Sequence, residues 1–351
     1  MSAPVMPSSQ PPVPREFVQT FHQATKVPGF VWDSLNANQV NANHVLPVLL
    51  KCMALERSGR MSQGHLWIVN YTLAHPHAKP QVRFVLACTD GNIGKYPIFI
   101  FTPIPYAYLQ YDTGIHNSMA LLANELRKNQ PDERTYSVFA VDIATTAWVH
   151  VWTRLTRIGA VQEPYYHAKV SFLTRGTFIP RDLPLPPDEA FELRPGTPQD
   201  INEIARLCYM FADESPPFRL NQQNAIREAT QLVERGQVWV HKWMKRGCPP
   251  RIVSIVAFTR NSDRVATITK VYTDPECRGR KCAERLVRAV CYELLKTKEK
   301  VALFVGLTNK AAIVYSRVGF VGIGDHAAPV NGVDTWLEIG FDPAHVRLGH
   351  W

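Results

Sequence analysis

Residues 271–283 place a basic turn between an apolar strand-like run and an amphipathic helix, and this segment constrains the fold most. The run ends with Val271, Tyr272 and Thr273, and a helical pattern starts at Cys282 and Ala283. The turn between them contains Arg278, Gly279, Arg280 and Lys281. A helix that opens directly after such a turn presents unpaired main-chain N–H groups and the positive end of its dipole. The segment therefore predicts a site for a phosphate group.

The same turn resembles motif A of the GNAT acyltransferase superfamily, usually written Arg/Gln-x-x-Gly-x-Gly/Ala. Arg278 and Ala283 fit the first and last positions, whereas Lys281 takes the place of the middle glycine. In that family, the main-chain amides of the motif hold the pyrophosphate of acetyl-CoA. A lysine at the middle position either crowds the phosphates or donates its ammonium group to them, and the sequence leaves both alternatives open.

A second resemblance lies downstream, where the apolar run of residues 301–307 precedes Tyr315-x-x-x-Gly319-Phe320. This pattern resembles motif B of the same superfamily, with a helix that ends at the glycine. The resemblance implies that Tyr315 is the general acid that protonates the departing CoA thiolate. The alternative is a tyrosine that only packs. The family's asparagine commonly lies seven residues before this tyrosine; here Thr308 stands at that position and Asn309 follows it.

The resemblance implies acetyl-CoA as the acyl donor, bound between the strands that end near Tyr272 and Leu307. The residues expected to bind it are Val271, Tyr272, Thr273, Arg278, Gly279, Arg280, Lys281, Cys282, Ala283 and Asn309. In this reaction a neutral amine attacks the thioester directly, so a group must first accept a proton from the amine. Glu214 is the candidate base that we select, and the alternatives are Asp213, His241 and His326. No metal site is expected.

The C-terminal half shows the order of elements that this superfamily requires. A strand at 191–195 precedes a helix that starts at Thr197-Pro198 and runs through Cys208. Further elements are expected as strands at 238–243, 252–259 and 265–272, a helix at 282–296, and strands at 301–307 and 335–341. The resemblance covers about residues 191–343.

The N-terminal half shows the same order of elements without the basic turn. Its patterns predict helices at 46–56, 115–128 and 144–157 and strands at 66–72, 82–89, 97–103, 135–141 and 165–173. We therefore expect an internal duplication. The predicted fold is α+β, with tandem GNAT-like domains that each have a mixed, mostly antiparallel twisted sheet flanked by helices. An unrelated α+β domain in the first half is the alternative.

The first copy is expected to have lost CoA binding. At the place of the basic turn, residues 102–114 contain Pro103 and Pro105, a single glycine and no basic residue. Both prolines remove main-chain donors that a phosphate site needs. The expected organisation is a disordered tail at 1–15, a degenerate GNAT-like domain at 16–176, a proline-rich linker at 177–190 and the acyltransferase domain at 191–351.

Composition limits the classes of function. The chain has 351 residues, of which 46% are hydrophobic and 20% charged, and it has no long apolar run, so we expect a globular protein without membrane association. Its seven cysteines lack Cys-x-x-Cys spacing, which favours a reducing cytoplasmic compartment, with the nucleus as an alternative. The formal net charge of +9 suits a polyphosphate ligand as well as nucleic acid. No nucleic-acid-binding motif occurs, so nucleic acid is not an expected partner.

The expected function is an acyl-CoA-dependent N-acetyltransferase that acts on a small-molecule or peptide amine. A non-catalytic CoA-binding or partner-binding pseudoenzyme is the alternative, because Lys281 and Asn309 depart from the family pattern. Nucleic-acid binding is a third hypothesis, suggested by charge alone. The sequence does not predict the amine acceptor, the acyl-chain preference or the oligomeric state.

Overall fold

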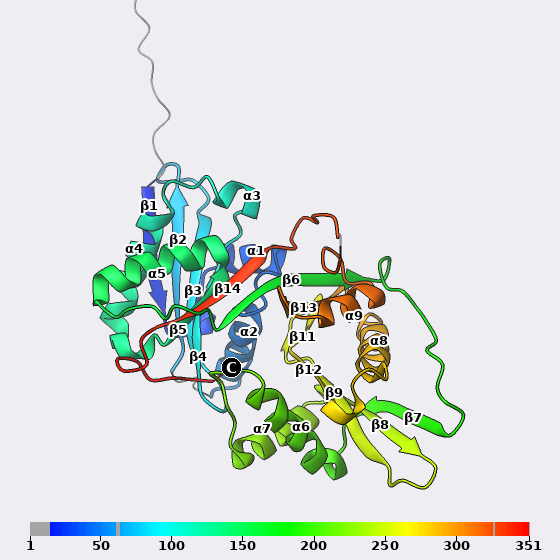
Figure 1. Cartoon of the computed structure of the whole chain (residues 1–351). Coiled ribbons are helices and arrows are strands. Elements are labelled where there is room, and N and C mark those ends of the chain that lie inside the picture. The colour runs from blue at the N-terminus through cyan, green and yellow to red at the C-terminus, as the bar shows by residue number, and fades with distance from the viewer. Residues whose placement is uncertain (1–14, 61–63, 326, 351) are drawn as a thin grey trace, which may run out of the picture.

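The computed structural model describes residues 15–60, 64–325 and 327–350 of the chain. Two halves lie side by side and are joined by strands that pass from one to the other (Figure 1). Arg15 begins strand β1 (Arg15–Phe21), so it does not belong to the expected tail, the rest of which lies outside the described residues. None of the described helices is both long and apolar enough to cross a bilayer.

The N-terminal half contains every element that its sequence pattern predicts, preceded by a strand and a helix that were not predicted. After β1 its elements are α1 (Gly29–Ala37), α2 (Leu46–Arg57), β2 (Leu66–Leu73), β3 (Gln81–Asp90), β4 (Lys95–Phe101), α3 (Tyr106–Leu109), α4 (Ile115–Asn129), β5 (Ser137–Val141), α5 (Asp142–Thr156) and β6 (Tyr166–Thr174). The short α3 occupies the segment that replaces the basic turn.

The C-terminal half repeats this order. Its elements are β7 (Glu189–Pro195), α6 (Ile201–Asp213), α7 (Gln222–Glu234), β8 (Val238–Lys245), β9 (Arg251–Ala257), β10 (Arg260–Asn261), β11 (Val265–Ile268), β12 (Lys270–Thr273), α8 (Cys282–Leu294), β13 (Lys300–Gly306), α9 (Ala311–Val318) and β14 (Thr335–Gly340). Helix α7 was not predicted, and the strand expected at 265–272 is divided into β11 and β12. With the short α3 and β10 set aside, the predicted duplication of element order is confirmed.

The described strands form two sheets. The larger has the order β1-β2-β3-β4-β5-β14-β6-β13-β11-β10, and the smaller has the order β12-β9-β8-β7. The pairs β4–β5 and β11–β13 are parallel, and the other neighbouring pairs are antiparallel. The predicted α+β class with a mixed, mostly antiparallel sheet is therefore confirmed.

The last strand of each half pairs with a strand of the other half. β14 lies between β5 and β6, with Trp336 opposite Val141 on one side and Ala168 on the other. β6 in turn pairs with β13, where Ala168 lies opposite Gly306. Figure 1 shows β6 in green and β14 in red crossing between the halves. The larger sheet thus runs across the predicted domain boundary, and the division into domains stays a prediction.

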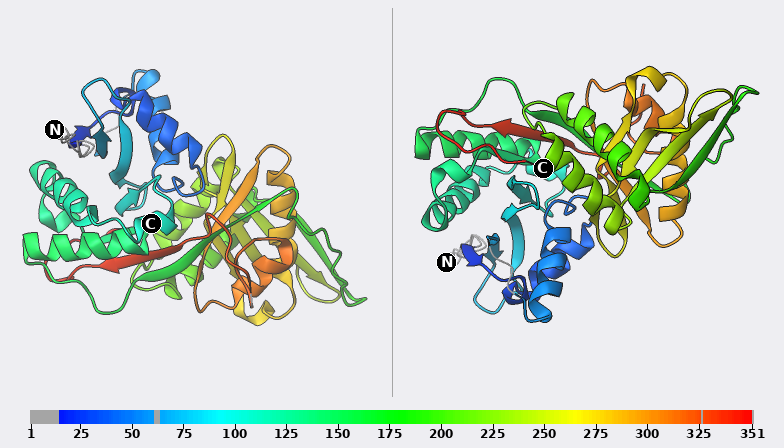
Figure 2. Two further views of the ribbon diagram at one scale, coloured as in Figure 1. Left: turned by 90° about the horizontal axis from the view of Figure 1, so that it is seen from above. Right: turned by 90° about the horizontal axis from the view of Figure 1, so that it is seen from below.

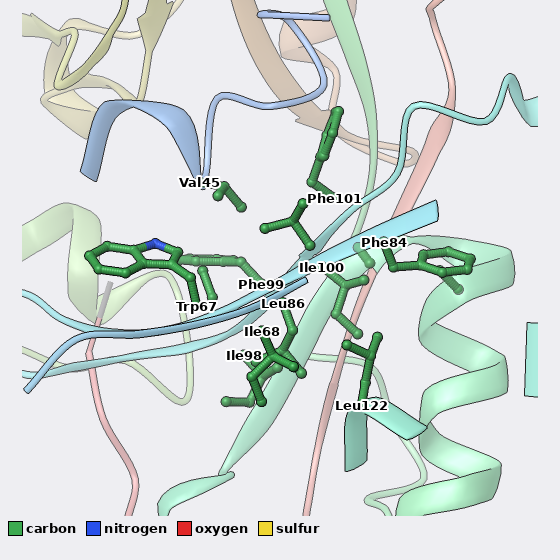
Figure 3. Packing of buried hydrophobic residues seen from close by; sticks show 14 of the residues in the cluster. Val45, Trp67, Ile68, Phe84, Leu86, Ile98, Phe99, Ile100, Phe101 and Leu122 are labelled. Atoms are coloured by element: carbon green, nitrogen blue, oxygen red, sulfur yellow. The ribbon is translucent and has the colours of Figure 1, made fainter. Parts of the chain in front are cut away.

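Each half also completes the hydrophobic core of the other. The N-terminal core includes Trp336 and Phe341 from the C-terminal half, and the core beneath α8 and α9 includes Leu173 from β6. In the N-terminal half, Val45 and Leu122 lie on opposite faces of the strands, so helices cover both faces (Figure 3). Neither half therefore buries its core with its own residues alone. Because apolar burial is the main stabilising contribution to folding, each half depends on the other for part of its stability.

The proline-rich linker lies against the helices of the C-terminal half. Arg288 of α8 donates hydrogen bonds to the carbonyl oxygens of Ile179 and Arg317. Arg285 donates to the carbonyl oxygen of Pro184 (2.8 Å), and the N–H of Ile179 donates to Val318 (3.0 Å). These bonds fix the linker on α8 and α9.

The C-terminal segment returns to the junction of the two halves (Figure 2). The N–H of His350 donates to the carbonyl oxygen of Lys95 (2.9 Å), at the start of β4. The ring of His350 lies 6.3 Å from that of Phe218, in the loop between α6 and α7. Residues far apart in the sequence thus meet beside this loop.

Candidate functional site

The strand formed by β11 and β12 leaves one sheet and enters the other. β11 is parallel to β13 from Val265 opposite Lys300 to Ile268 opposite Leu303. β12 pairs instead with β9. From Thr269 onward the chain therefore diverges from β13, and the two strands form a wedge that opens toward the basic turn.

The edge of β12 that faces this wedge carries main-chain groups without a strand partner in the described sheet. The N–H of Asp274 donates to the carbonyl of Val253 (2.8 Å), so Asp274 and, by antiparallel alternation, Tyr272 direct their main-chain groups toward β9. Val271 and Thr273 direct theirs away from β9. An extended ligand with amide groups can pair with such an edge, as an added strand does.

The turn before α8 presents a row of free main-chain donors. Within the described part of the chain, none of the N–H groups from Gly279 to Glu284 donates a hydrogen bond. The first N–H bonded to this turn is that of Arg285, which donates to the carbonyl of Lys281 (3.0 Å). The row lies at the positive end of the α8 dipole. This geometry suits an anion with several oxygen atoms, such as a diphosphate.

Lys281 adopts the backbone conformation that a glycine would adopt without strain. Its φ is +60° and its ψ +20°, in the left-handed region, and Gly279 two residues earlier has a φ of +77°. The backbone of any residue with a Cβ atom is strained in this region. The Lys281 side chain is exposed and makes no hydrogen bond or ion pair with any described residue, so it does not close the turn.

The arginines of the turn contact other elements. Arg278 donates to both carboxylate oxygens of Glu214, at 2.9 and 2.8 Å, and to the carbonyl of Thr273 at 3.2 Å. Arg280 contacts Glu189 at 3.3 Å and lies over the ring of Trp243. Arg278 thereby connects the turn, the free edge of β12 and the end of α6.

Glu214, the predicted base, is bound to two groups of this site. The hydroxyl of Tyr272 donates to its carboxylate at 2.6 Å, and Arg278 forms the ion pair described above. The hydrogen bond from Tyr272 and then the Arg278 guanidinium hold the pKa of Glu214 below its usual value. A lowered pKa makes the carboxylate a weaker proton acceptor.

The alternative bases lie in different surroundings. Asp213 is exposed at the end of α6, and His326 lies outside the described residues. His241 is fully buried on β8, with its ring 5.2 Å from that of Phe191. Burial and then the charge of Arg285 lower the pKa of His241 to about 4. Within the described part of the chain, no contact brings Asp213 or His241 to the wedge.

Tyr315, the predicted acid, lies on α9 beside the wedge. It is 8% exposed and belongs to the cluster of apolar side chains that includes Val305 of β13, with Val271 of β12 packed against it. Its ring lies 5.9 Å from that of Phe320. Burial and then the proximity of Tyr166 raise the pKa of Tyr315, so its hydroxyl is protonated at neutral pH.

Two other predicted ligands have structural contacts of their own. The side-chain oxygen of Asn309 accepts the N–H of Ala311 (2.9 Å) at the start of α9. Cys282 and Cys277 are buried next to Trp243, and burial raises the pKa of the Cys282 thiol to about 11. The Cys282 thiol is therefore an inert packing group, and the contribution of this residue to the turn is its main-chain N–H.

The corresponding turn of the N-terminal half uses several of its donors internally. The N–H groups of Asp112 and Ile115 donate to carbonyls within the turn, and that of Gly114 donates to the Asp112 carboxylate at 3.0 Å. Asp112 also forms an ion pair with Arg83 (2.6 Å). A carboxylate thus stands where a phosphate would need to bind, which supports the prediction that this copy is degenerate.

The comparisons with known proteins agree with the geometry of the C-terminal half. The model of the acetyltransferase (GNAT) family matches residues 199–320. This segment is a GNAT domain. It contains the wedge, the turn before α8 and Tyr315. No protein among the curated sequences matches the chain.

Three solved structures have distant similarity to most of the chain. A tandem GNAT protein from the clavulanic acid biosynthesis pathway is 11% identical, covers 93% of this chain and 98% of its own, and has a TM-score of 0.49. A GCN5-related N-acetyltransferase from Sphaerobacter thermophilus is 11% identical, with coverages of 92% and 94% and a TM-score of 0.48. One from Kribbella flavida is 15% identical, with coverages of 74% and 86% and a TM-score of 0.43. With TM-scores below 0.5, they do not establish the arrangement of this chain, which rests on its own strand pairing.

The N-terminal half contributes residues to the GNAT domain that the sequence did not predict. The carbonyl of His167 on β6 accepts the N–H of Leu307 (3.0 Å), directly after β13. Tyr166, the preceding residue, lies close enough to Tyr315 to affect its pKa. Both depend on the exchanged strand, for which the sequence carries no local signal.

We expect His241 to make the GNAT domain less stable as the pH falls. Its pKa is about 4 in the folded chain and about 6.5 when unfolded, so the unfolded chain binds more protons between these values. The contribution of His241 to the free energy of unfolding is therefore fully present above pH 6.5 and is lost as the pH falls toward 4. At pH 5 the loss amounts to about 2 kcal/mol. His241→Leu should flatten the plot of unfolding free energy against pH, as measured by urea denaturation.

His75→Leu is the control, because His75 is exposed. An equal pH dependence in the wild-type chain and His241→Leu would contradict the prediction. Removal of the imidazole ring can also lower the free energy of unfolding at every pH through lost packing. The slope of unfolding free energy against pH reports the titration alone, so the slopes of the variants are compared.

Proposed function

We propose that this protein is an N-acyltransferase that moves an acetyl group from acetyl-CoA to a primary amine. The observation that carries the proposal is the uninterrupted row of free N–H groups from Gly279 to Glu284, at the positive end of α8 and beside the wedge. Acetyl-CoA supplies the acetyl group as a thioester. Its pyrophosphate has the charge and the oxygen atoms that these donors require. The adjoining edge of β12 suits the amide-containing arm between pyrophosphate and thioester.

Each residue of the site has a distinct part in the proposed reaction. The main-chain groups of Val271 and Thr273 pair with the arm, and an N–H on this edge polarises the thioester carbonyl. The amine nitrogen attacks the carbonyl carbon, the carbon–sulfur bond breaks, and the amine gives its proton to a solvent water molecule, and solvent returns a proton to Tyr315 after the thiol has left. Tyr315 donates its hydroxyl proton to the sulfur as it leaves. The raised pKa of Tyr315 keeps that proton in place until then.

The proposed acceptor is a small molecule or a peptide amine that enters from the side of the α6–α7 loop. Glu214 directly follows α6, and Phe218 of the same loop contacts Tyr136 and Tyr165 of the other half. The acceptor side is therefore built from both halves. We place the reaction in the cytoplasm, where acetyl-CoA and reduced thiols are both available.

A non-catalytic CoA-binding protein is the second candidate. Asn309 binds the first turn of α9 instead of standing seven residues before Tyr315, and Lys281 replaces the usual glycine. Calorimetric titration with acetyl-CoA, and with heparin as a polyanion without adenine or thioester, tests binding first. Failure of acetyl-CoA to bind would reject both candidates, and binding of heparin alone would favour a nucleic-acid-like ligand.

Tyr315→Phe should separate an enzyme from a binding protein. The variant keeps the ring in its cluster but removes the proton donor, so we expect turnover to fall by about 10²-fold or more, since general acid catalysis contributes that much. The dissociation constant for acetyl-CoA should change less than about twofold, because binding does not use the hydroxyl. Mass spectrometry of acetylated products from a panel of amines gives the rate. Tyr292→Phe, on an exposed residue of α8, is the matched control.

Two substitutions of Lys281 decide between crowding and charge donation. The exposed side chain leaves the turn open, so we propose that its ammonium group binds phosphate. Lys281→Met and Lys281→Gly should then both weaken acetyl-CoA binding by about fivefold, the effect of one exposed charge pair. If the side chain crowds the phosphates, Lys281→Gly should instead bind more tightly than wild type. Lys296→Met, at the other end of α8, serves as the control in the same titration.

Glu214→Gln tests whether this carboxylate is a base or an anchor. The ion pair with Arg278 and the lowered pKa favour an anchor that competes with phosphate for the guanidinium. We expect the variant to bind acetyl-CoA up to about fivefold more tightly and to retain turnover, since exposed ion pairs contribute little. Unchanged affinity with a loss of turnover of tenfold or more would identify Glu214 as the base. Glu276→Gln removes another exposed partner of an arginine and serves as the control.

A further inference from the structure

The N-terminal half contains a cavity where its own cofactor turn would lie. The cavity has a volume of about 620 Å³, which is within the usual range for small-molecule sites. Its walls come from the α3–α4 segment, the first turns of α4 and α5, and strands β6 and β14. The lining residues are Leu109, Gln110, Asp112, Thr113, Ile115, His116, Asp142, Ile143, Thr146, Ala147, His167 and Leu337.

The charge of this cavity is opposite to that of the turn before α8. Its lining includes two carboxylates, Asp112 and Asp142, and neither lysine nor arginine. Arg83 balances Asp112 through an ion pair of 2.6 Å. Asp142 has no ion pair with any described residue. The cavity therefore has an excess of negative charge on the wall formed by α5.

Asp142 is held in a fixed position. The hydroxyl of Tyr106 donates to its two carboxylate oxygens at 2.9 and 3.0 Å, and the N–H of Ile143 donates at 2.7 Å. Asp334 lies near enough for the charge of Asp142 to contribute to its raised pKa, after the larger effect of burial. An oriented carboxylate with a second one nearby attracts a cation and repels an anion.

The segment that forms one wall also exposes two aromatic rings. Tyr108 is 72% exposed and Tyr111 is 78% exposed, and they flank the lining residues Leu109 and Gln110. Exposure of these apolar ring faces to water is unfavourable compared with burial. Tyr111 directly precedes the lining carboxylate Asp112 in the chain, and an exposed tyrosine ring attracts organic cations through its negative face. The two rings belong to the segment that forms this wall, so they are available to the part of a ligand that extends from the cavity toward solvent.

We propose that the cavity of the N-terminal half binds a small organic ammonium ion with an apolar body. The ammonium group pairs with Asp142, the apolar body occupies the space between Ile143 and Leu337, and Tyr108 and Tyr111 contact the part nearest to solvent. The proposal does not depend on CoA binding by the C-terminal half. It assigns a ligand to the copy whose turn carries the Asp112 carboxylate at the place of the phosphate site.

The test uses the full chain without acetyl-CoA and three probes of nearly equal shape. 2-Phenylethylamine is a cation at pH 7, 2-phenylethanol is its neutral counterpart, and 3-phenylpropionate is an anion. Calorimetric titration should show binding of the amine at least about tenfold tighter than of the alcohol, as expected for one charge-assisted hydrogen bond. The anion should not bind detectably. Equal binding of amine and alcohol, or no binding of the amine, would overturn the proposal.

Variants then locate the amine in this cavity. Asp142→Asn should reduce its affinity by about tenfold, to the level of the alcohol, while Asp33→Asn on the surface of α1 should not change it. Thermal unfolding of both variants shows whether the fold is kept. Tyr111→Ala, at an exposed position that the fold does not need, should weaken binding by about two- to fivefold. Amine binding that neither Asp142→Asn nor Tyr111→Ala affects would place the amine elsewhere and reject the site.

Discussion

The pairing of each half's last strand with the other half determines the rest of this structure. β14 completes the sheet of the N-terminal half, and β6 completes the sheet of the GNAT domain. Both strands are central, so each would expose two edges and lose buried side chains if the halves separated. Trp336 in one core and Leu173 in the other show this dependence. The exchange gives a physical reason to keep a copy without a phosphate turn: the GNAT domain lacks a strand without it.

The two halves differ most at one turn. In the GNAT domain, the N–H groups from Gly279 to Glu284 donate to no described residue, and Lys281 within this row has a left-handed backbone conformation. In the other half, the Asp112 carboxylate and nearby carbonyls accept several of the donors before α4, and two prolines precede this turn. The same element order therefore supports an anion site in one copy and a cavity with negative charge in the other. The two copies thus differ in local hydrogen bonding at this turn and share their element order.

Most of the elements were predictable because their signals are local. Alternating or continuous apolar runs identified the strands from β2 to β14 except the two-residue β10, and the glycine after α9 is Gly319, in the left-handed conformation that the motif predicts. Helix α1 was missed because it begins at Gly29 and contains residues of low helix propensity. Its helix depends on burial of Val31 and Leu35 against the sheet. The expected strand at 265–272 was placed correctly, but its division at Thr269, which opens the wedge, was not foreseen.

The sequence alone determined the two element orders, the turn and the position of Tyr315, because residues close in the chain produce each of these signals. Only the tertiary structure decided which side chains from distant parts of the sequence contact those residues. Glu214 meets Arg278 only when the end of α6 approaches the turn, and Tyr166 reaches Tyr315 only through the exchanged β6. Such contacts join residues more than 60 positions apart, as Arg278 and Glu214 are by 64, and no local pattern encodes them. They arise because the cores can be buried, and the strand edges covered, only when the halves fold together.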